Sequence, residues 1–263
     1  MKIYTASELS GARGDFMFLY GETGVGKSVT ALQTAPLPIL YIMTEPRDVT
    51  KFLIAANRQD AADQIDFTFY TNWEEMIDFI NDHNNFKKYQ SIIIDSISHL
   101  IAINLAIEIK DEGYNAMDEK KKAEKSLTFQ AKMSQEGYGT LADQMIRFTH
   151  DLALLAQRGK TVICLARLDQ NPKFNRSLAA GPTLKGLEYA KHMPGFCDFI
   201  GMVEPRFNEE GEVIYPPLVS FEPTGAYMAK WNGVMPDGGA TRKILNIEMI
   251  LKAARGELGK KGE

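Results

Sequence analysis

Eight consecutive residues near the start of the chain have the composition and spacing of a phosphate-binding loop. The stretch reads Gly21-Glu22-Thr23-Gly24-Val25-Gly26-Lys27-Ser28, with two glycines five residues apart followed by Lys and Ser. The glycines let the backbone turn its N–H groups toward a polyphosphate such as that of ATP. We expect the Lys27 ammonium to face the β- and γ-phosphates and the Ser28 hydroxyl to bind Mg²⁺. A glycine turn without a ligand is the alternative interpretation.

The residues on either side of this loop predict the strand and the helix that it needs. Residues 16–20 form a short, all-apolar run of strand length. Residues 28–34 contain helix formers and neither Gly nor Pro. A helix that begins at the loop would add its partial positive charge to the phosphate site.

A second candidate is Asp95, which ends the mostly apolar run at 91–94. A carboxylate at the end of a buried strand is costly unless it serves a charge, and in a phosphate-loop protein that charge is usually Mg²⁺. Asp95 could instead cap the following helix. Ser96 stands where many ATPases place a Glu that activates water, so that carboxylate must come from elsewhere in the chain.

Glu45 is the candidate for this second carboxylate. It follows a predicted strand at 38–43 and would therefore lie at the carboxyl edge of the same parallel sheet, where ligands bind. There it would act as a general base or position the attacking water. A hinge carboxylate that binds neighbouring backbone N–H groups is the alternative.

The remaining pattern predicts an α/β fold, with a mostly parallel central sheet flanked by helices and a C-terminal β-hairpin extension. Further strands are expected at 65–70, 91–95, 161–166, 199–204, 212–221 and 226–231. Helices are expected at 48–59, 73–82, 138–158 and 246–255, and Asn72 with Glu75 forms a capping box before the second of these. Residues 167–195 are predicted to be mostly loop, because prolines and glycines interrupt them.

Length and composition favour a single domain. With 263 residues, of which 44% are hydrophobic, the chain can bury one large core. We expect one domain over 1–263, with its core at about 16–206 and C-terminal strands and a helix at about 207–257. Residues 108–139 are a charged, candidate mobile insertion in that core. The insertion is either a solvated helical face or a lid, partner-binding or DNA-contacting segment.

Charge and cysteine content restrict the class of protein further. A formal net charge of −4 and a pI near 5.7 argue against a uniformly basic, nucleic-acid-coating surface, so any DNA contact must be a local patch. Cys164 and Cys197 lack metal-binding spacing, which predicts reduced, buried thiols. No signal-peptide core and no apolar run of roughly 18 residues are present. We expect a soluble, cytoplasmic protein without a membrane partner.

The phosphate loop, Glu45 and the run that ends in Asp95-Ser96 together resemble the RecA-type ATPase core. More narrowly, residues 16–255 are similar to the short, core-only RecA-like ATPases of bacteriophages, some of which act as single-strand annealing or recombination proteins. Residues 181–186, Asp198, residues 227–230 and residues 246–255 are similar in order to later landmarks of that subgroup. The resemblance implies a homo-oligomer, a ring or a filament, that binds nucleotide between adjacent subunits in a bacterial or phage-infected cell.

The resemblance also implies roles for two cations. Lys230 would reach the γ-phosphate bound to a neighbouring subunit, although Trp231-Asn232-Gly233 stands where many relatives follow this Lys closely with Arg. Arg167 falls near the polar residue that relatives place after the strand equivalent to 161–166. It would sense the γ-phosphate, or else pair with an acid such as Asp169.

The prediction of nucleic-acid binding rests on residues 170–185, which correspond in order to a DNA-binding loop of RecA relatives. Lys173 and Arg176 would contact phosphates, and Phe174 would stack on a base with a contribution of roughly 1–3 kcal/mol. An ordinary surface loop with a half-buried Phe is the alternative.

These expectations predict an ATP-hydrolysing, Mg²⁺-dependent RecA-like protein that binds single-stranded DNA and supports phage-type recombination, strand annealing or replication. One alternative is an oligomeric motor or loader in DNA replication or packaging. Another is a protein in which ATP mainly switches assembly. A small-molecule kinase is disfavoured, because Glu45 and the Asp95-Ser96 pair point to water activation.

Overall fold

The computed structural model describes residue 5, residues 14–117, residue 122, residues 133–235 and residues 242–257. Its strands are β1 (Phe16–Gly21), β2 (Ile39–Met43), β3 (Ile65–Phe69), β4 (Ser91–Asp95), β5 (Thr161–Gln170), β6 (Ala180–Pro182), β7 (Phe199–Phe207), β8 (Val213–Ser220), β9 (Lys230–Trp231) and β10 (Arg242–Ile244). They form a sheet in the order β10-β8-β7-β1-β5-β4-β2-β3, with β6 beside β5 and β9 beside β7. The six strands from β7 to β3 in this order run parallel, and the other pairings are antiparallel. The predicted α/β fold with a mostly parallel sheet is confirmed.

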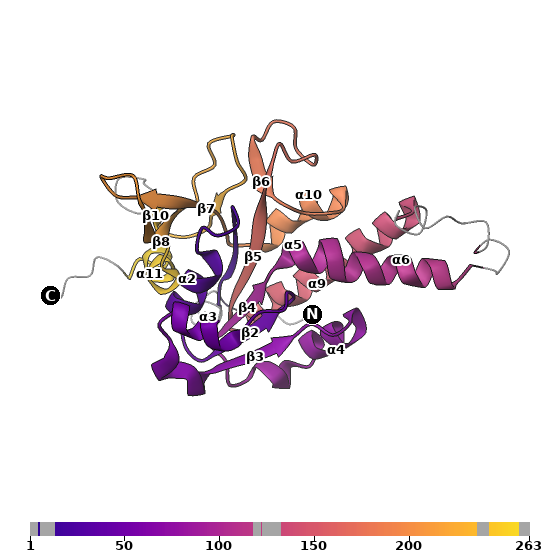
Figure 1. Ribbon diagram of the computed structural model, residues 1–263, viewed down its shortest axis with the longest axis horizontal. Helices are drawn as coiled ribbons and strands as arrows, with labels where there is room; N and C mark the ends of the chain where they lie inside the picture. Colours follow the sequence, from indigo (N-terminus) through magenta and orange to yellow (C-terminus); the bar gives the residue numbers. More distant parts are fainter. Residues whose placement is uncertain (1–4, 6–13, 118–121, 123–132, 236–241, 258–263) are drawn as a thin grey trace.

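Helices cover both faces of this sheet (Figure 1). They are α2 (Lys27–Thr34), α3 (Val49–Ala55), α4 (Trp73–Asn81), α5 (Ile97–His99), α6 (Leu105–Asn115), α9 (Gln135–Gln157), α10 (Leu187–Phe196) and α11 (Ile247–Ala254). Short 3₁₀ segments lie at Gln59–Gln64 and His83–Phe86, and a π-helical turn, Leu100–Asn104, leads into α6. The paired helices α6 and α9 extend away from the sheet, to the right in Figure 1.

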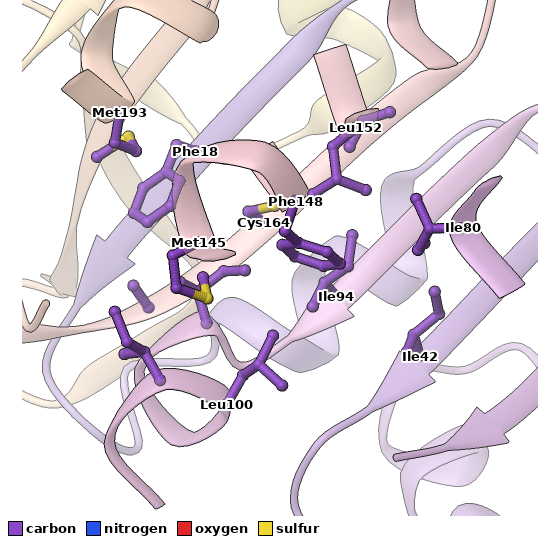
Figure 2. Packing of buried hydrophobic residues seen from close by; sticks show 14 of the residues in the cluster. Phe18, Ile42, Ile80, Ile94, Leu100, Met145, Phe148, Leu152, Cys164 and Met193 are labelled. Atoms are coloured by element: carbon purple, nitrogen blue, oxygen red, sulfur yellow. The ribbon is translucent and has the colours of Figure 1, made fainter. Parts of the chain in front are cut away.

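The core consists of two layers, one on each face of the sheet, because successive residues of a strand point to opposite faces. On one face Phe18, Ile94 and Cys164 pack against α9, which contributes Met145, Phe148 and Leu152 (Figure 2). On the other face Leu19, Tyr41, Ile93 and Ile163 pack against residues of α2, α3 and α11. Cys164 and Cys197 are free thiols and both are buried, as the sequence predicts.

Most predicted elements are found close to their expected bounds, and Asn72 accepts the predicted capping hydrogen bond from the Glu75 backbone N–H at 2.9 Å. The prediction of a mostly looped segment at 167–195 is wrong in two places. β5 continues to Gln170, and α10 occupies residues 187–195 of that segment. Burial of Tyr189, Ala190 and Met193 stabilises α10 and offsets the hydrogen bond that Pro194, which has no N–H, cannot donate in the last turn.

The structure differs from the predicted secondary structure in three further elements. α3 ends at Ala55, earlier than predicted, and the strand expected at 226–231 is reduced to the two residues of β9. β10 was not expected from the sequence pattern. The charged insertion begins in α6 and ends in α9, while its residues 118–121 and 123–132 lie outside the described part of the chain. None of the described helices combines the length and apolar character that crossing a membrane requires.

Candidate active site

The candidate residues lie where four neighbouring parallel strands end. In the sheet β1, β5, β4 and β2 are adjacent in this order, and their carboxyl ends meet at one edge. The register pairs Gly21 with Arg167, and it pairs Asp95 with both Leu165 and Met43. Residues that follow these positions in the chain therefore converge, as expected for a ligand site in an open α/β sheet.

A cavity of about 810 Å³ opens at this edge. It brings together eight candidate residues identified from the sequence, namely Thr23, Gly24, Gly26, Lys27, Ser28, Glu45, Asp95 and Arg167. Its other lining residues include Arg47 and Tyr215, which the sequence pattern did not indicate. This volume is in the range of small-molecule binding sites.

The phosphate loop has the backbone that an anion site needs. Gly24 and Gly26 adopt left-handed conformations, with φ of 86° and 96°, which other residues rarely adopt. α2 begins directly after Gly26. This glycine occupies the N-cap position and has no side chain that could cap the first turn. The N–H groups and the positive end of α2 therefore suit the cavity, and this arrangement fits a phosphate group.

Lys27 is held within this loop. Its ammonium group donates hydrogen bonds to the carbonyls of Gly21 at 2.8 Å and Glu22 at 2.7 Å. Burial lowers the pKa of Lys27 to about 8, in spite of the opposing charges of Asp95 and Glu22. Since a bound polyphosphate would stabilise the charged amine, this lysine fits the predicted phosphate contact.

Asp95 is almost completely buried, and its Oδ2 atom has two partners. The Tyr41 hydroxyl donates to it at 2.7 Å, and Nη1 of Arg47 lies 3.0 Å away. Ser28 lines the same cavity. In the part of the chain that the structure describes, no cluster of three or more His, Cys, Asp or Glu side chains could hold a metal by itself. A site of one hydroxyl and one carboxylate, completed by phosphate oxygens and water, is the kind that suits Mg²⁺.

Glu45 is fixed by several neighbours. Its Oε1 atom accepts hydrogen bonds from Ser96 Oγ at 2.9 Å and Arg167 Nη2 at 3.0 Å, and Arg47 Nη2 lies 3.5 Å from Oε2. Burial would raise the pKa of Glu45, but the hydrogen bonds and positive charges of these neighbours outweigh it and lower the pKa. The carboxylate is therefore ionised at neutral pH and able to accept a proton or orient a water molecule.

A backbone clamp sets the spacing of the two carboxylates. The Thr44 hydroxyl donates to the Ser96 carbonyl at 2.9 Å and accepts from the Ser96 N–H at 2.8 Å, while the Thr44 N–H donates to the Asp95 carbonyl at 2.9 Å. These bonds join the ends of β2 and β4. Glu45 and Asp95 are thus presented to the cavity from a rigid support.

Arg167 lies in the cavity, where its guanidinium forms an ion pair with Glu45. Its backbone N–H donates to Ser98 Oγ at 2.9 Å, and this hydroxyl donates to the Thr183 carbonyl at 2.9 Å. The pairing expected as an alternative, with Asp169, is therefore replaced by a pairing with the candidate base. Sequence order alone could not reveal Glu45 as the partner, because Glu45 follows β2 whereas Arg167 lies in β5.

The candidate DNA-binding residues lie outside the cavity. Lys173 and Arg176 are exposed, whereas Phe174 is half-buried and packs near Gly181, where an added Cβ would lie 3.1 Å from the ring. Lys173 and Phe174 line a separate cavity of about 660 Å³ together with Lys185. β5 connects the two places, because it carries Arg167 in its second half and then leads into this loop.

Lys230 also lies away from the phosphate loop. It pairs with Ile200, which is level with Phe18 in the middle of β1. Its ammonium group donates to the carbonyls of Pro194 at 3.0 Å and Cys197 at 2.6 Å, at the C-terminal end of α10. These contacts favour a structural role within the same chain over the predicted role across a subunit interface.

Two further residues of the site carry only weak signals in the sequence. Arg47 follows Glu45 by two residues, so its place after a predicted strand is one such signal. Tyr41 lies within an apolar strand, where its hydroxyl indicates a buried polar partner.

Comparison with known proteins adds one finding. The family described as AAA domain matches the chain over residues 13–230, a range that contains the phosphate loop, Glu45, Asp95 and Arg167. No curated protein matches the chain.

Proposed function

The chain belongs to the AAA domain family, and from this premise we propose that it is an Mg²⁺-dependent ATPase that hydrolyses ATP in the cavity beside the phosphate loop. One observation carries this proposal. The phosphate loop, Asp95 and Glu45 come from the ends of β1, β4 and β2, and they line a single cavity. A phosphate cradle, a metal-binding carboxylate and a candidate base are the parts that ATP hydrolysis needs.

Binding of the nucleotide would begin with the loop and Lys27. The N–H groups of the first turn of α2 would donate to phosphate oxygens, and the Lys27 ammonium would leave the Gly21 and Glu22 carbonyls for the β- and γ-phosphates. Ser28 and Asp95 would hold Mg²⁺, which supplies neutralisation of the charge on the phosphate oxygens.

Glu45 would then orient the attacking water. Its carboxylate accepts hydrogen bonds from Ser96 and Arg167, and a water molecule in line with the γ-phosphate would become a further donor. Because positive neighbours lower the pKa of Glu45, its carboxylate is better suited to accept a hydrogen bond from the water and orient it than to keep a transferred proton. The water's proton would pass to Glu45 or to the departing phosphate.

We also propose that the ATPase binds single-stranded DNA through the loop of Lys173, Phe174 and Arg176. Two exposed cations support backbone contacts, while the half-buried ring of Phe174 offers only part of its surface for stacking. Gln170, which ends β5, donates to Glu22 Oε1 at 3.5 Å. A change in this loop on binding DNA would therefore reach the phosphate loop and, through Arg167, Glu45.

Self-association is a further part of the proposal. Phe69, Ile103 and Ile107 are exposed apolar residues that line a cavity of about 410 Å³ together with Glu45. Exposed apolar residues that adjoin a site of this kind suit contact with another protein surface. A second copy of the chain, packed here, would place its own residues beside the bound nucleotide, as in a ring or filament.

The test is ATP turnover by the full chain, measured with and without single-stranded DNA and accompanied by a sizing experiment. We expect hydrolysis that requires Mg²⁺, increases with single-stranded DNA and depends on protein concentration. Hydrolysis without any effect of DNA would remove the recombination, annealing or replication role and would favour an ATP-switched assembly. Absence of hydrolysis under all these conditions would contradict the ATPase itself.

A further inference from the structure

Arg47 bridges the two carboxylates of the site. Its Nη1 atom lies 3.0 Å from Asp95 Oδ2, and its Nη2 atom lies 3.5 Å from Glu45 Oε2. The side chain extends from residues 44–48, which belong to no helix or strand, and about a third of it is exposed. Arg47 also lines the same cavity as Lys27 and Ser28.

Arg47 occupies the space beside the Asp95 carboxylate that a metal ion bound to Asp95 would need. The carboxylate has one oxygen engaged by both Arg47 and the buried hydroxyl of Tyr41. A divalent cation that binds Asp95 would be brought next to the guanidinium, and two cations at that distance repel strongly in a partly buried site. Occupation of Asp95 by metal and by Arg47 are therefore competing states.

Released from Asp95, the guanidinium would find its replacement anion inside the cavity. Arginine presents several N–H donors in a planar fork that matches phosphate oxygens, and it remains charged at every accessible pH. Because the side chain is partly exposed and leaves from a loop, a change of rotamer does not require the core to move. A terminal phosphate between Lys27 and Glu45 would lie within the same cavity.

We propose that Arg47 exchanges partners when ATP binds, leaving Asp95 to the metal and binding the γ-phosphate from within the same chain. Arg47 then determines the preference of the site for nucleoside triphosphate over diphosphate. The inference rests on the proposed ATPase function. It also supplies a cation for the γ-phosphate, a part that Lys230 is poorly placed to play because it is bound to carbonyls of its own chain.

The experiment compares nucleotide binding by the full chain and by Arg47→Ala, using calorimetry with a non-hydrolysable ATP analogue and with ADP in the presence of Mg²⁺. Removal of a charge-assisted phosphate contact should weaken binding of the ATP analogue about 10- to 100-fold, with ADP affinity changed less than about threefold. Arg47→Lys, which keeps a charge but not the planar fork, should lie between these values. Arg147→Ala is the matched control, because Arg147 is an exposed residue of α9 that pairs with Asp143.

A second measurement tests whether Arg47 competes with metal for Asp95 in the absence of nucleotide. Mn²⁺, followed by electron paramagnetic resonance, should bind nucleotide-free Arg47→Ala more tightly than the wild-type chain, because the competing cation at Asp95 is gone. Equally weakened binding of both nucleotides, unchanged binding of both, or unchanged Mn²⁺ affinity would overturn the inference. When one of these outcomes is found, the wild-type chain separates the two failures. If it binds neither nucleotide, the proposed ATPase fails as well, whereas if it binds and hydrolyses ATP, only the proposed role of Arg47 fails. Unfolding curves for each variant establish that it is folded. If Arg47→Ala does not fold, the nucleotide-binding comparison is made with Arg47→Lys.

Discussion

Arg167 and Glu45 are 122 residues apart in the chain, yet Nη2 of Arg167 lies 3.0 Å from Oε1 of Glu45. The contact joins the end of β2 to β5, which continues into the candidate DNA-binding loop. If that loop binds DNA, as proposed, the contact is a direct route by which binding would change the orientation of the candidate base. The pair also explains how a carboxylate on a short loop is kept ionised and in place.

Glu45→Gln tests the chemical role of this carboxylate. Gln keeps the size and can still accept hydrogen bonds from Ser96 and Arg167, but it cannot take a proton. We expect nucleotide affinity to change less than about threefold and hydrolysis to slow by roughly 100-fold or more, as expected when a general base is removed. Glu248→Gln, on the surface of α11, is the control. Wild-type turnover, or an unfolded protein, would show that Glu45 has a structural role.

Lys230→Ala separates the two interpretations of that lysine. Removal of its ammonium group leaves the carbonyls of Pro194 and Cys197 without this donor, so the free energy of unfolding should fall by about 1–3 kcal/mol in urea denaturation. Lys252→Ala, which breaks a surface pair with Glu248, should change it by less than about 1 kcal/mol. A role across an interface would instead leave stability unchanged, and mixing Lys230→Ala with Glu45→Gln protein would restore turnover.

The proposal that the loop of Lys173 and Arg176 binds single-stranded DNA predicts how the affinity depends on salt. Replacement of Lys173 and Arg176 together by Ala should weaken binding of single-stranded DNA at low salt. It should also reduce the slope of log affinity against log salt by about 0.7 for each DNA phosphate that the variant no longer neutralises. Fluorescence anisotropy with a labelled oligonucleotide measures both quantities, and Lys191→Ala, on the exposed side of α10, is the control. A weaker affinity with an unchanged slope would rule out phosphate binding by these two residues.

The sequence was sufficient to predict the parts of the site that depend on local pattern. The apolar runs that became β1, β2 and β4 each lead directly to a chemically distinctive residue, and parallel pairing then places these ends at one edge. The phosphate loop, Asp95 and Glu45 could therefore be predicted to lie together. Their convergence needed only the fold class, because side chains at the ends of parallel strands share one edge of the sheet.

What the sequence could not provide is the set of partners that come from register and rotamer. Arg47 is two residues from Glu45, but its ion pair with Asp95 depends on how the loop after β2 turns. The position of Lys230 depends on the antiparallel pairing of a two-residue strand with β7, for which no local signal exists. α10 was missed because its proline suggested a loop, whereas burial of one helix face against α9 determined the structure.

Phosphate release from ATP by the wild-type chain and by Lys27→Ala, each with Mg²⁺ and with excess chelator, is the most direct measurement of whether this cavity hydrolyses ATP. The Lys27 ammonium donates to carbonyls of its own loop, so its removal should leave the fold intact while removing the cation that faces the β- and γ-phosphates. Lys51→Ala, on the exposed surface of α3, is the control. We expect Mg²⁺-dependent release by the wild-type chain and the Lys51→Ala control, and none above background by Lys27→Ala. Release by Lys27→Ala at the wild-type rate, or no release by the wild-type chain, would contradict hydrolysis at this site.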